Sequence, residues 1–345
     1  MQLALGLILL VVGADFMVRA AVRIAARLQV RPLIIGLTVV AFGSSAPQMA
    51  ISTQAVLGNA PDIAFGSVIG SSIFSLLVTL GGCALLTPLR VSRELVRLDL
   101  PLMFGASALV FVLAFNGPFG GREGVVLLLA LLGYLWLLRR QARHHGRTYP
   151  AVVVPTRTWP RGVLMFVAGI GLLVGGGHLL LQSTVALASG LGLSERVIGL
   201  TLVAVSASLP ELATSLVATL RGQRDIAVAN VVGSNLFNLL GVLGVTAVLA
   251  PLPLSISPNA LDFDLPVMLG VAALTLPLFY SGLRITRLEG LMLLALYALY
   301  GLHLISFTTG MPLAARLEHA MLRYVLPAMA LLVVISTWRA WRQRH

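Results

Sequence analysis

Two short segments place oxygen-bearing side chains inside long hydrophobic stretches. They read GSSAPQ at 43–48 and SASLPE at 206–211. Proline lacks an N–H and its ring clashes with the carbonyl four residues earlier, so Pro47 should free the carbonyl of Gly43, and Pro210 that of Ser206. A freed carbonyl inside a bilayer needs a partner, and a bound cation can serve as one.

The same turns add further oxygen atoms. Ser44, Ser45 and Ser208 supply hydroxyls, Glu211 supplies a carboxylate, and Gln48 supplies a neutral amide oxygen at the position that matches Glu211. Hard cations are bound by oxygen sets of this kind. An isolated acid in the middle of a membrane span is costly and usually functional, so Glu211 is the strongest single candidate.

A second pair of polar segments follows, GSVIGSSIFS at 66–75 and ANVVGSNLFN at 229–238. Ser75 and Asn238 each lie 27 residues beyond Gln48 and Glu211. That spacing leads up one helix and down the next, so the four oxygen-bearing positions can meet near the middle of the membrane. Small polar residues also simply pack membrane helices together, and this reading stays open for a second set: Ser71, Ser72, Ser234 and Asn235.

These segments belong to one internal repeat. Residues 36–81 align with 199–244 without a gap, and 22 of the 46 positions are identical. Paired, proline-interrupted hydrophobic segments in the two halves of a membrane protein indicate the binding site of a secondary transporter.

Composition excludes an ordinary soluble domain. The 345 residues are 58% hydrophobic and 10% charged, whereas soluble domains have about 25% charged residues. The net charge of +12 comes from 24 basic residues, all arginine, which fall between apolar stretches and form no patch for nucleic acid. The single cysteine, Cys83, can form no internal disulfide.

Hydropathy predicts an all-α polytopic membrane protein. A span needs about 20 mainly apolar residues, and eleven stretches qualify: 3–24, 33–57, 63–87, 98–116, 123–139, 162–183, 196–219, 225–251, 262–281, 287–306 and 320–338. With the N-terminus outside, 19 arginines fall on the inner side and four on the outer side. The positive-inside rule therefore favours an outside N-terminus and a cytoplasmic C-terminus.

Five spans per repeat bring the second half into the membrane from the opposite side, so the ten spans should form two inverted repeats. We expect a first half at 1–139, a basic cytoplasmic linker at 140–161, a second half at 162–308, and an eleventh span with a basic tail at 309–345.

Other polar residues carry weaker signals. Asp15 aligns with His178, and both are expected near the outer ends of their spans. Asp264 begins a span, where the helix dipole favours an acid. The remaining histidines are expected in loops or tails, without the ligand spacing of a zinc site: His144, His145, His303, His319 and His345. No cluster of nucleophile, acid–base or metal ligands indicates an enzyme.

The two copies resemble the α-repeats of the calcium/cation antiporter superfamily, the sodium/calcium exchangers, and are most similar to the prokaryotic branch. The resemblance rests on GSSAPQ and SASLPE, then on GSSIFS and GSNLFN. It implies ten helices in inverted repeats, central cation sites and alternating access. By position it places cation ligands at Ser44, Ser45, Gln48, Ser75, Ser208, Glu211 and Asn238, and sodium-binding carbonyls at Ala41 and Ala204.

This chain departs from the family pattern at three positions. Gln48 replaces one of two central glutamates, Ala207 replaces a hydroxyl residue, and Ser75 replaces the usual asparagine. One formal charge facing Ca²⁺ leaves one positive charge uncompensated, which is costly at low dielectric, whereas one charge balances Na⁺ or H⁺.

The expectation is therefore a secondary-active Na⁺/Ca²⁺ antiporter with weakened calcium affinity, located in a bacterial inner (plasma) membrane. Its partners would be small cations and the lipid bilayer, with no resident cofactor. Two alternatives remain on the same fold: a monovalent cation/proton antiporter, in which Glu211 titrates, and a transport-impaired family member.

Overall fold

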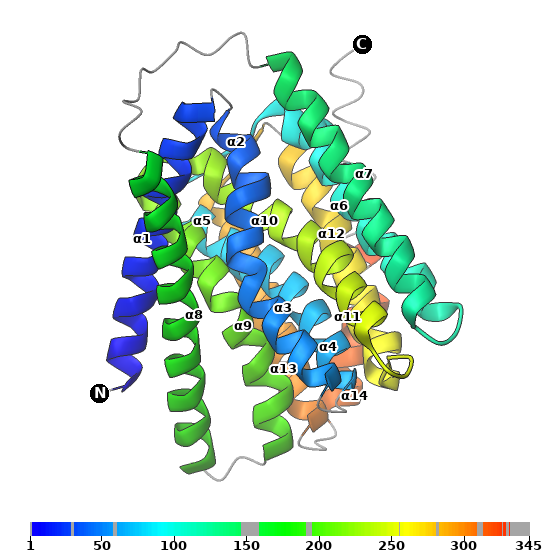
Figure 1. Ribbon diagram of the computed structural model, residues 1–345. Helices are drawn as coiled ribbons and strands as arrows, with labels where there is room; N and C mark the ends of the chain where they lie inside the picture. The colour runs from blue at the N-terminus through cyan, green and yellow to red at the C-terminus, as the bar shows by residue number, and fades with distance from the viewer. Residues whose placement is uncertain are drawn as a thin grey trace, which may run out of the picture.

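The computed structural model describes residues 2–28, 31–57, 61–145, 159–190, 195–254, 256–280, 283–308 and 313–325, with three further residues before 332. This part of the chain is almost entirely helical (Figure 1). Nine helices within it are long and apolar enough to cross a membrane, and the shorter apolar stretch Val205–Leu220 belongs to a tenth. The ten predicted spans are thus found in order.

The first half begins with α1 (Gln2–Leu28). The second span joins α2 (Pro32–Ile35), the π-helical turn η1 (Gly36–Val40) and α3 (Ala41–Leu57). The third joins α4 (Pro61–Phe74), η2 (Ser75–Thr79) and α5 (Leu80–Leu86). The fourth is η3 (Leu95–Asp99) with α6 (Leu100–Phe115), and the fifth is α7 (Gly121–His145).

The second half repeats this order. It runs through α8 (Trp159–Gly190) and α9 (Glu195–Leu220). The eighth span joins α10 (Arg224–Leu236), η5 (Phe237–Val242) and α11 (Leu243–Leu249). The ninth is η6 (Ala260–Asp264) with α12 (Leu265–Tyr280), and the tenth is α13 (Arg287–Thr308). After these come α14 (Leu313–Ala320) and η7 (Met321–Val325). Most of the expected eleventh span and most of the linker at 140–161 lie outside the described residues.

Glycine contacts between α1 and α8 show the inverted symmetry directly. A Cβ added at Gly13 would meet the Gly169 carbonyl at 2.9 Å, and one at Gly6 would meet the Gly176 carbonyl at 3.0 Å. In the repeat alignment Gly6 corresponds to Gly169 and Gly13 to Gly176. Each glycine therefore contacts the equivalent of the other glycine on its own helix, as a twofold axis through an antiparallel helix pair requires.

The last span of each half also packs against the other half. A Cβ at Gly81 in α5 would meet the Gly290 carbonyl of α13 at 2.9 Å, while one at Gly124 in α7 would meet the Gly244 carbonyl of α11 at 2.7 Å. Each half's third span therefore packs against the other half's fifth span. Two backbone pairings accompany this packing, that of β1 (Leu89–Arg90) with β2 (Arg284–Ile285) and the bridge between Phe119 and Leu254.

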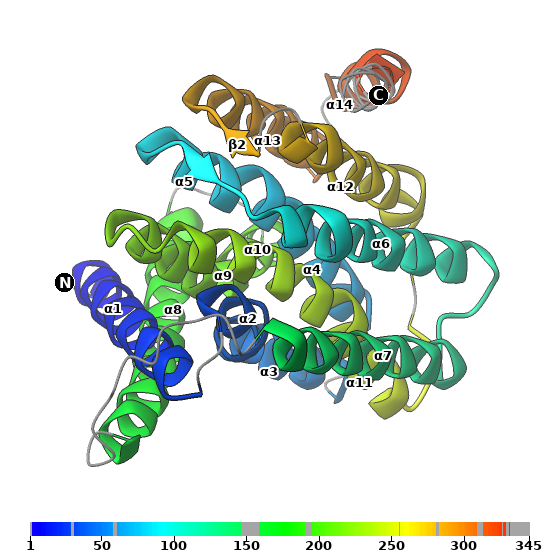
Figure 2. The ribbon, with the colours of Figure 1, turned by 90° about the horizontal axis from the view of Figure 1, so that it is seen from above.

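The four helices that carry the repeated segments occupy the centre. Seen from above, α3, α4, α9 and α10 lie in the middle, with α1 and α8 together at one side and α13 at the other (Figure 2). The third and eighth spans are the most buried of the candidate spans. Polar side chains on these helices are therefore screened from the surrounding lipid.

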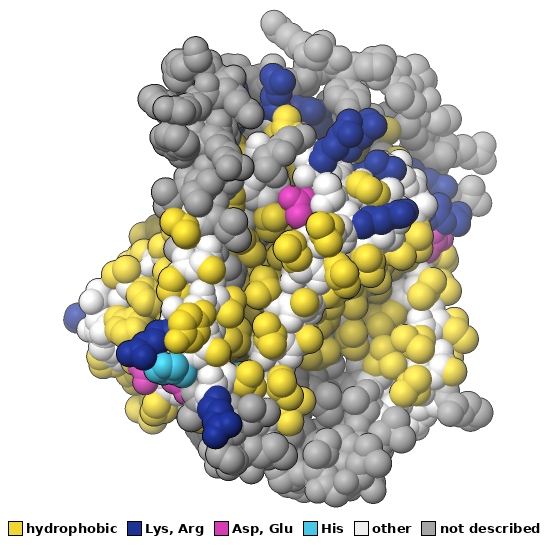
Figure 3. Space-filling model, turned by 180° about the vertical axis from the view of Figure 1, so that it is seen from behind, with side chains coloured by type: hydrophobic (Ala, Val, Ile, Leu, Met, Phe, Trp, Pro, Cys, Tyr) yellow, Lys and Arg dark blue, Asp and Glu magenta, His cyan; other side chains and the backbone are white. Residues whose placement is uncertain are grey.

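Basic side chains gather at one end of the molecule. Figure 3 shows arginine side chains clustered above a broad hydrophobic band. The inter-span segments at this end, called here the basic end, carry Arg90, Arg93, Arg221, Arg224, Arg284 and Arg287. The charge distribution agrees with the predicted orientation, in which the basic end faces the cytoplasm.

Candidate cation site

The repeated segments place most of the predicted ligands on four central helical spans. Ala41, Ser44, Ser45 and Gln48 lie on α3, and Ser208 and Glu211 on α9, with Pro47 and Pro210 inside helices that continue through them. Ser75 opens η2 and Asn238 lies in η5. The α3 and α9 helices contact each other, η2 contacts α9, and η5 contacts α3. Ala204 also falls on α9, but outside the residues whose side chains are described.

Five of the predicted ligands present buried atoms that have no hydrogen-bond partner. They are the hydroxyls of Ser45 and Ser75, the amide oxygens of Gln48 and Asn238, and Oε1 of Glu211. Each of these residues is at most 4% exposed. Leaving a buried polar atom unpaired costs about 1–3 kcal/mol. Five such oxygens on four packed spans are therefore a feature that calls for an explanation, and a bound cation would supply the missing partner.

The Gln48 amide has a defined orientation. Its Nε2 donates to the hydroxyls of Ser67 at 3.0 Å and Ser52 at 3.2 Å. The Ser67 hydroxyl donates its own proton to the Ala64 carbonyl at 3.0 Å. It can therefore only accept a hydrogen bond from Gln48. This relay fixes the position of the amide nitrogen and leaves Oε1 buried without a hydrogen-bond partner.

The carboxyl group of Glu211 lies next to the Ser75 hydroxyl of the opposite half. One helical turn away, Ser208 donates to Ser71 at 2.8 Å, and the Asn238 amide approaches the same Ser71 hydroxyl at 3.5 Å. Ser71 was open to a pure packing interpretation. Its contacts show that it joins two predicted ligands across the interface between the repeats.

Ser44 differs from the unpaired group because its hydroxyl is already engaged. It contacts Asn230 Oδ1 and the Ser234 hydroxyl at 3.0 Å each, and the Ala41 carbonyl at 3.2 Å. These bonds tie α3 to α10. Ser44 and the Ala41 carbonyl, both predicted as ligands, are thus hydrogen-bonded to each other.

The polar residues that lie next to Gln48 and Glu211 were not predicted from the sequence. Ser67 and Asn230 occupy equivalent repeat positions, as do Ser52 and Ser215. Asn230 Nδ2 donates to Ser215 at 2.9 Å and approaches the Glu211 carbonyl at 3.5 Å. The repeat alignment contained the signal, because a polar residue stands at each of these positions in both copies.

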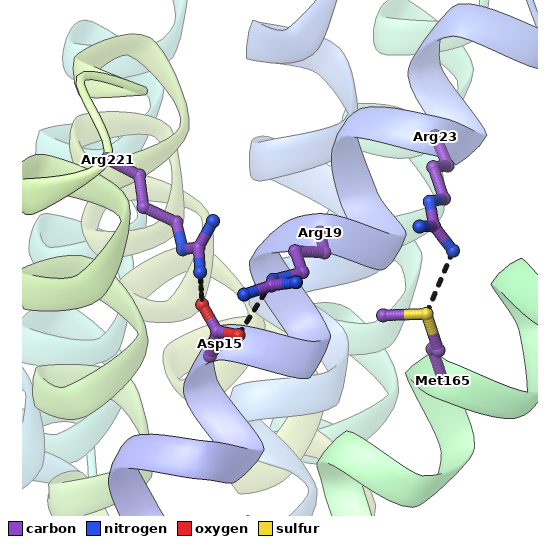
Figure 4. Close-up of polar contacts among 5 residues, drawn as sticks. All are labelled: Asp15, Arg19, Arg23, Met165 and Arg221. Carbon is purple, nitrogen blue, oxygen red and sulfur yellow. Dashed lines mark hydrogen bonds and ion pairs between the residues drawn. The ribbon is translucent and has the colours of Figure 1, made fainter.

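Two expectations about the positions of other polar residues are wrong. Asp15 pairs locally with Arg19 at 2.7 Å, but its carboxylate also binds Arg221, which follows α9 at the basic end and not at the outer end (Figure 4). His303 lies in α13 and is fully buried, with its ring 3.8 Å from that of Phe263. Across the described residues, no group of three His, Cys, Asp or Glu side chains is arranged to hold a metal.

A further pair of contacts repeats in the two halves. Tyr134 donates to Asp99 at 3.4 Å, and Tyr300 donates to Asp264 at 3.0 Å. Each links the start of a fourth span to the fifth span of the same half. The acid at Asp264, explained from the sequence by the helix dipole alone, therefore has a side-chain partner.

Comparison with known proteins supports one family. The family model described as sodium/calcium exchanger protein matches residues 1–139 and 161–306. The putative antiporter CaxA of Alkalimonas amylolytica is 35% identical over 303 residues, covering 86% of this chain and 95% of that protein. The sodium/calcium exchanger MaX1 of Methanosarcina acetivorans is 29% identical over 337 residues, covering 86% and 96%.

A solved structure of the sodium–calcium exchanger NCX_Mj, soaked with 100 mM Na⁺ and 10 mM Sr²⁺, superposes with a TM-score of 0.75 at 31% identity. The match covers 86% of this chain and 95% of that one. Sequence, fold and the internal repeat thus agree, and the chain belongs to the sodium/calcium exchanger family as a membrane antiporter of that type.

Proposed function

We propose that this protein exchanges Na⁺ for Ca²⁺ across a membrane through the central site between its two repeats. The proposed ligands are the side chains of Ser44, Ser45, Gln48, Ser75, Ser208, Glu211 and Asn238, with the carbonyls of Ala41 and Ala204. The observation that carries the proposal is the set of five buried, unpaired side-chain oxygens on the packed central spans, one of which is Glu211 Oε1. Solved structures of a relative with Na⁺ and Ca²⁺ present support it.

The transport mechanism follows from the inverted symmetry. The ligands come from both repeats, so the site lies between two units of similar shape and opposite direction. Rocking of these units can open it to one side of the membrane at a time. At paired glycines the backbones of α1 and α8 lie directly against each other.

The charge of the site controls which ion it prefers. Glu211 is the single acid in the proposed set, and Gln48 offers a neutral oxygen. One negative charge balances one Na⁺. Ca²⁺ would retain one uncompensated positive charge in a poorly polarisable environment, and calcium affinity depends strongly on the number of charged ligands. We therefore expect calcium affinity to be weaker than in a site with two carboxylates.

The same charge count supports a second candidate, exchange of a monovalent cation for protons. In that case Glu211 would alternate between cation-bound and protonated forms. Strong pH dependence without calcium flux would favour this function. A family member impaired in transport would show neither flux.

We also propose that the protein acts in a bacterial inner membrane, without enzymatic activity or a resident cofactor. A relative 36% identical over 280 residues is an inner membrane protein of Escherichia coli, YrbG. The proposed units are the halves 1–139 and 162–308, separated by the linker 140–161 and followed by 309–345.

Uptake of ⁴⁵Ca²⁺ into proteoliposomes, driven by an outward sodium gradient, tests the function. Wild-type protein should accumulate calcium, and collapse of the gradient should stop it. Glu211→Gln removes the acid and should abolish uptake, while Glu123→Gln, which changes an acid at the start of α7 away from the site, should not. Failure of the wild type in this assay, together with pH-gradient-driven sodium flux, would replace calcium exchange with the second candidate.

A further inference from the structure

Two buried polar stripes lead away from the central site. One follows the third span and the other follows α9, each with a polar residue at every fourth position. This spacing keeps the side chains on one helix face. All of them are at most 3% exposed. The stripes consist of Ser75, Thr79 and Cys83, and of Glu211, Ser215 and Thr219.

The stripes lie against each other at both ends. Ser75 is next to Glu211 at the central site, and the Cys83 thiol is next to the Thr219 hydroxyl. Between them, a Cβ added at Gly82 would be 3.8 Å from the side chain of Leu216. Eight residues of helix correspond to about 12 Å, so the stripes extend from Glu211 well toward the basic end.

Thr79 is unusual among the buried threonines of the described spans. Four others donate to a carbonyl of their own helix at 2.7–2.8 Å, namely Thr214, Thr219, Thr246 and Thr275. Thr79 closes the π-helical turn η2, and its hydroxyl has no partner although the residue is fully buried. An unpaired hydroxyl between Ser75 and Cys83 is available to a passing ion.

The symmetry-related stretch does not have this character. The equivalents of Thr79 and Thr219 are Val242 and Val56, so an apolar side chain interrupts the polar series on each of the equivalent helices. The equivalent of Cys83 is Thr246. Beyond the site, two polar residues of the stripes are thus replaced by valine in the equivalent stretch. Only one direction from Glu211 carries a continuous polar stripe on the third span or its equivalent.

Two arginines lie at the far end of the stripes. At the end of α5, Arg287 Nη2 donates to the Leu86 carbonyl at 3.4 Å. Arg221 follows Thr219 by two residues, and its guanidinium is drawn to Asp15 on α1, which Arg19 also binds (Figure 4). The ion pair compensates part of the positive charge that a departing cation would meet.

We propose that the two facing stripes form the route by which the transported cation passes between Glu211 and the basic end, with the Thr79 hydroxyl as a transient ligand. This inference rests on the proposed cation exchange. Along the route, hydroxyls replace part of the ion's hydration shell. Cys83 is the last buried position of its stripe, because the next position at the same spacing, Thr87, is partly exposed.

The single cysteine of the chain makes the route directly testable. Sealed proteoliposomes with the basic end outward would be treated with a positively charged, membrane-impermeant methanethiosulfonate reagent, and labelling of Cys83 and ⁴⁵Ca²⁺ exchange would be followed together. Cys83 should react, saturating Na⁺ should slow the reaction by about tenfold, and the labelled protein should lose exchange. The double variant Cys83→Ala/Thr246→Cys is the control. It moves the single thiol to the equivalent buried position of the second repeat, where it should not react with reagent added at the basic end.

Thr79→Val provides a second measurement that does not depend on labelling. It preserves shape and should lower the exchange rate by about tenfold, while Thr246→Val, whose hydroxyl already bonds its own helix, should leave the rate unchanged. Normal exchange with an unreactive Cys83 and a fully active Thr79→Val would overturn the route and leave the exchange function intact. Sodium-protected labelling in protein that shows no exchange would support the route and reject the exchange function; neither labelling nor exchange would reject both.

Discussion

At the scale of single residues, the central question is how one acid and one amide share a cation site. Gln48 and Glu211 occupy equivalent repeat positions, yet the groups behind them differ. Ser67 and Ser52 accept from the Gln48 amide, whereas Asn230 and Ser215 bond to each other beneath Glu211. The surroundings of Gln48 are thus matched to an amide, which supports a neutral residue at this position of the proposed site.

Gln48→Glu should therefore increase calcium affinity. It should also lower the stability of the protein when no calcium is bound. A second carboxylate supplies the charge that Ca²⁺ lacks in the wild type, and we expect at least about tenfold tighter binding. Two facing acids repel each other when no cation is bound, so the melting temperature should fall in chelator and recover with calcium. Titration calorimetry and thermal unfolding measure both effects. Gln54→Glu, exposed on the same helix, is the control; an equal response there would assign the effect to surface charge.

Ser67→Ala should weaken cation binding by releasing the Gln48 amide. Without the acceptor at 3.0 Å, the amide can rotate and present its N–H groups to the ion, which repels it. We expect the sodium concentration for half-maximal exchange to rise by about three- to tenfold. Ser107→Ala, which removes another buried hydroxyl bonded to its own helix, should leave this concentration unchanged. Lower stability with an unchanged sodium dependence would show that Ser67 is only structural.

At the scale of helices, close glycine contacts set the distance between neighbouring spans. The α1–α8 and α5–α13 contacts each place a glycine about 3 Å from the partner's backbone oxygen, measured from an added Cβ. Membrane helices gain little from burying apolar side chains against each other rather than against lipid. Their association therefore depends on such close backbone packing.

Gly169→Ala should destabilise the protein by about 1–3 kcal/mol, because its Cβ would meet backbone atoms of Gly13 and Met17 at 3.0 Å and the helices must separate. Gly171→Ala lies two residues away on α8 and would meet nothing within 4 Å, so it should be neutral or slightly stabilising. Thermal unfolding in detergent separates the two cases. Equal melting temperatures would mean that α1 and α8 adjust without cost.

At the scale of the whole molecule, the sequence was sufficient for the number and order of ten spans and for their inverted arrangement. Hydropathy and an ungapped repeat encode these features locally. Which helices pack against each other could not be predicted, because no feature of the α5 sequence identifies α13 as its neighbour. The π-helical turns at Ser75–Thr79 and Phe237–Val242 also escaped prediction, because they arise from tertiary packing. They matter for the site, as Ser75 and Asn238 lie within them.

The same limit explains which polar residues were misjudged. Glu211 was recognised because an isolated acid in a span is costly wherever it points. The roles of Ser71, Ser67 and Asn230 depend on which helix each side chain faces, and that information is long-range. Asp15 was misplaced for this reason too, since its partner Arg221 is more than 200 residues away in the sequence.

The orientation of the molecule determines the direction in which its ion gradients act. Arginines concentrate at the basic end (Figure 3), which the positive-inside rule assigns to the cytoplasm. In a Cys83→Ala background, Arg93→Cys at this end and Asn116→Cys at the opposite end both give exposed thiols. In intact cells, an impermeant maleimide should label Asn116→Cys and spare Arg93→Cys, and permeabilisation should expose both. The reverse pattern would place the route from Glu211 through Thr79 on the outer side, so that it would admit external rather than cytoplasmic cations.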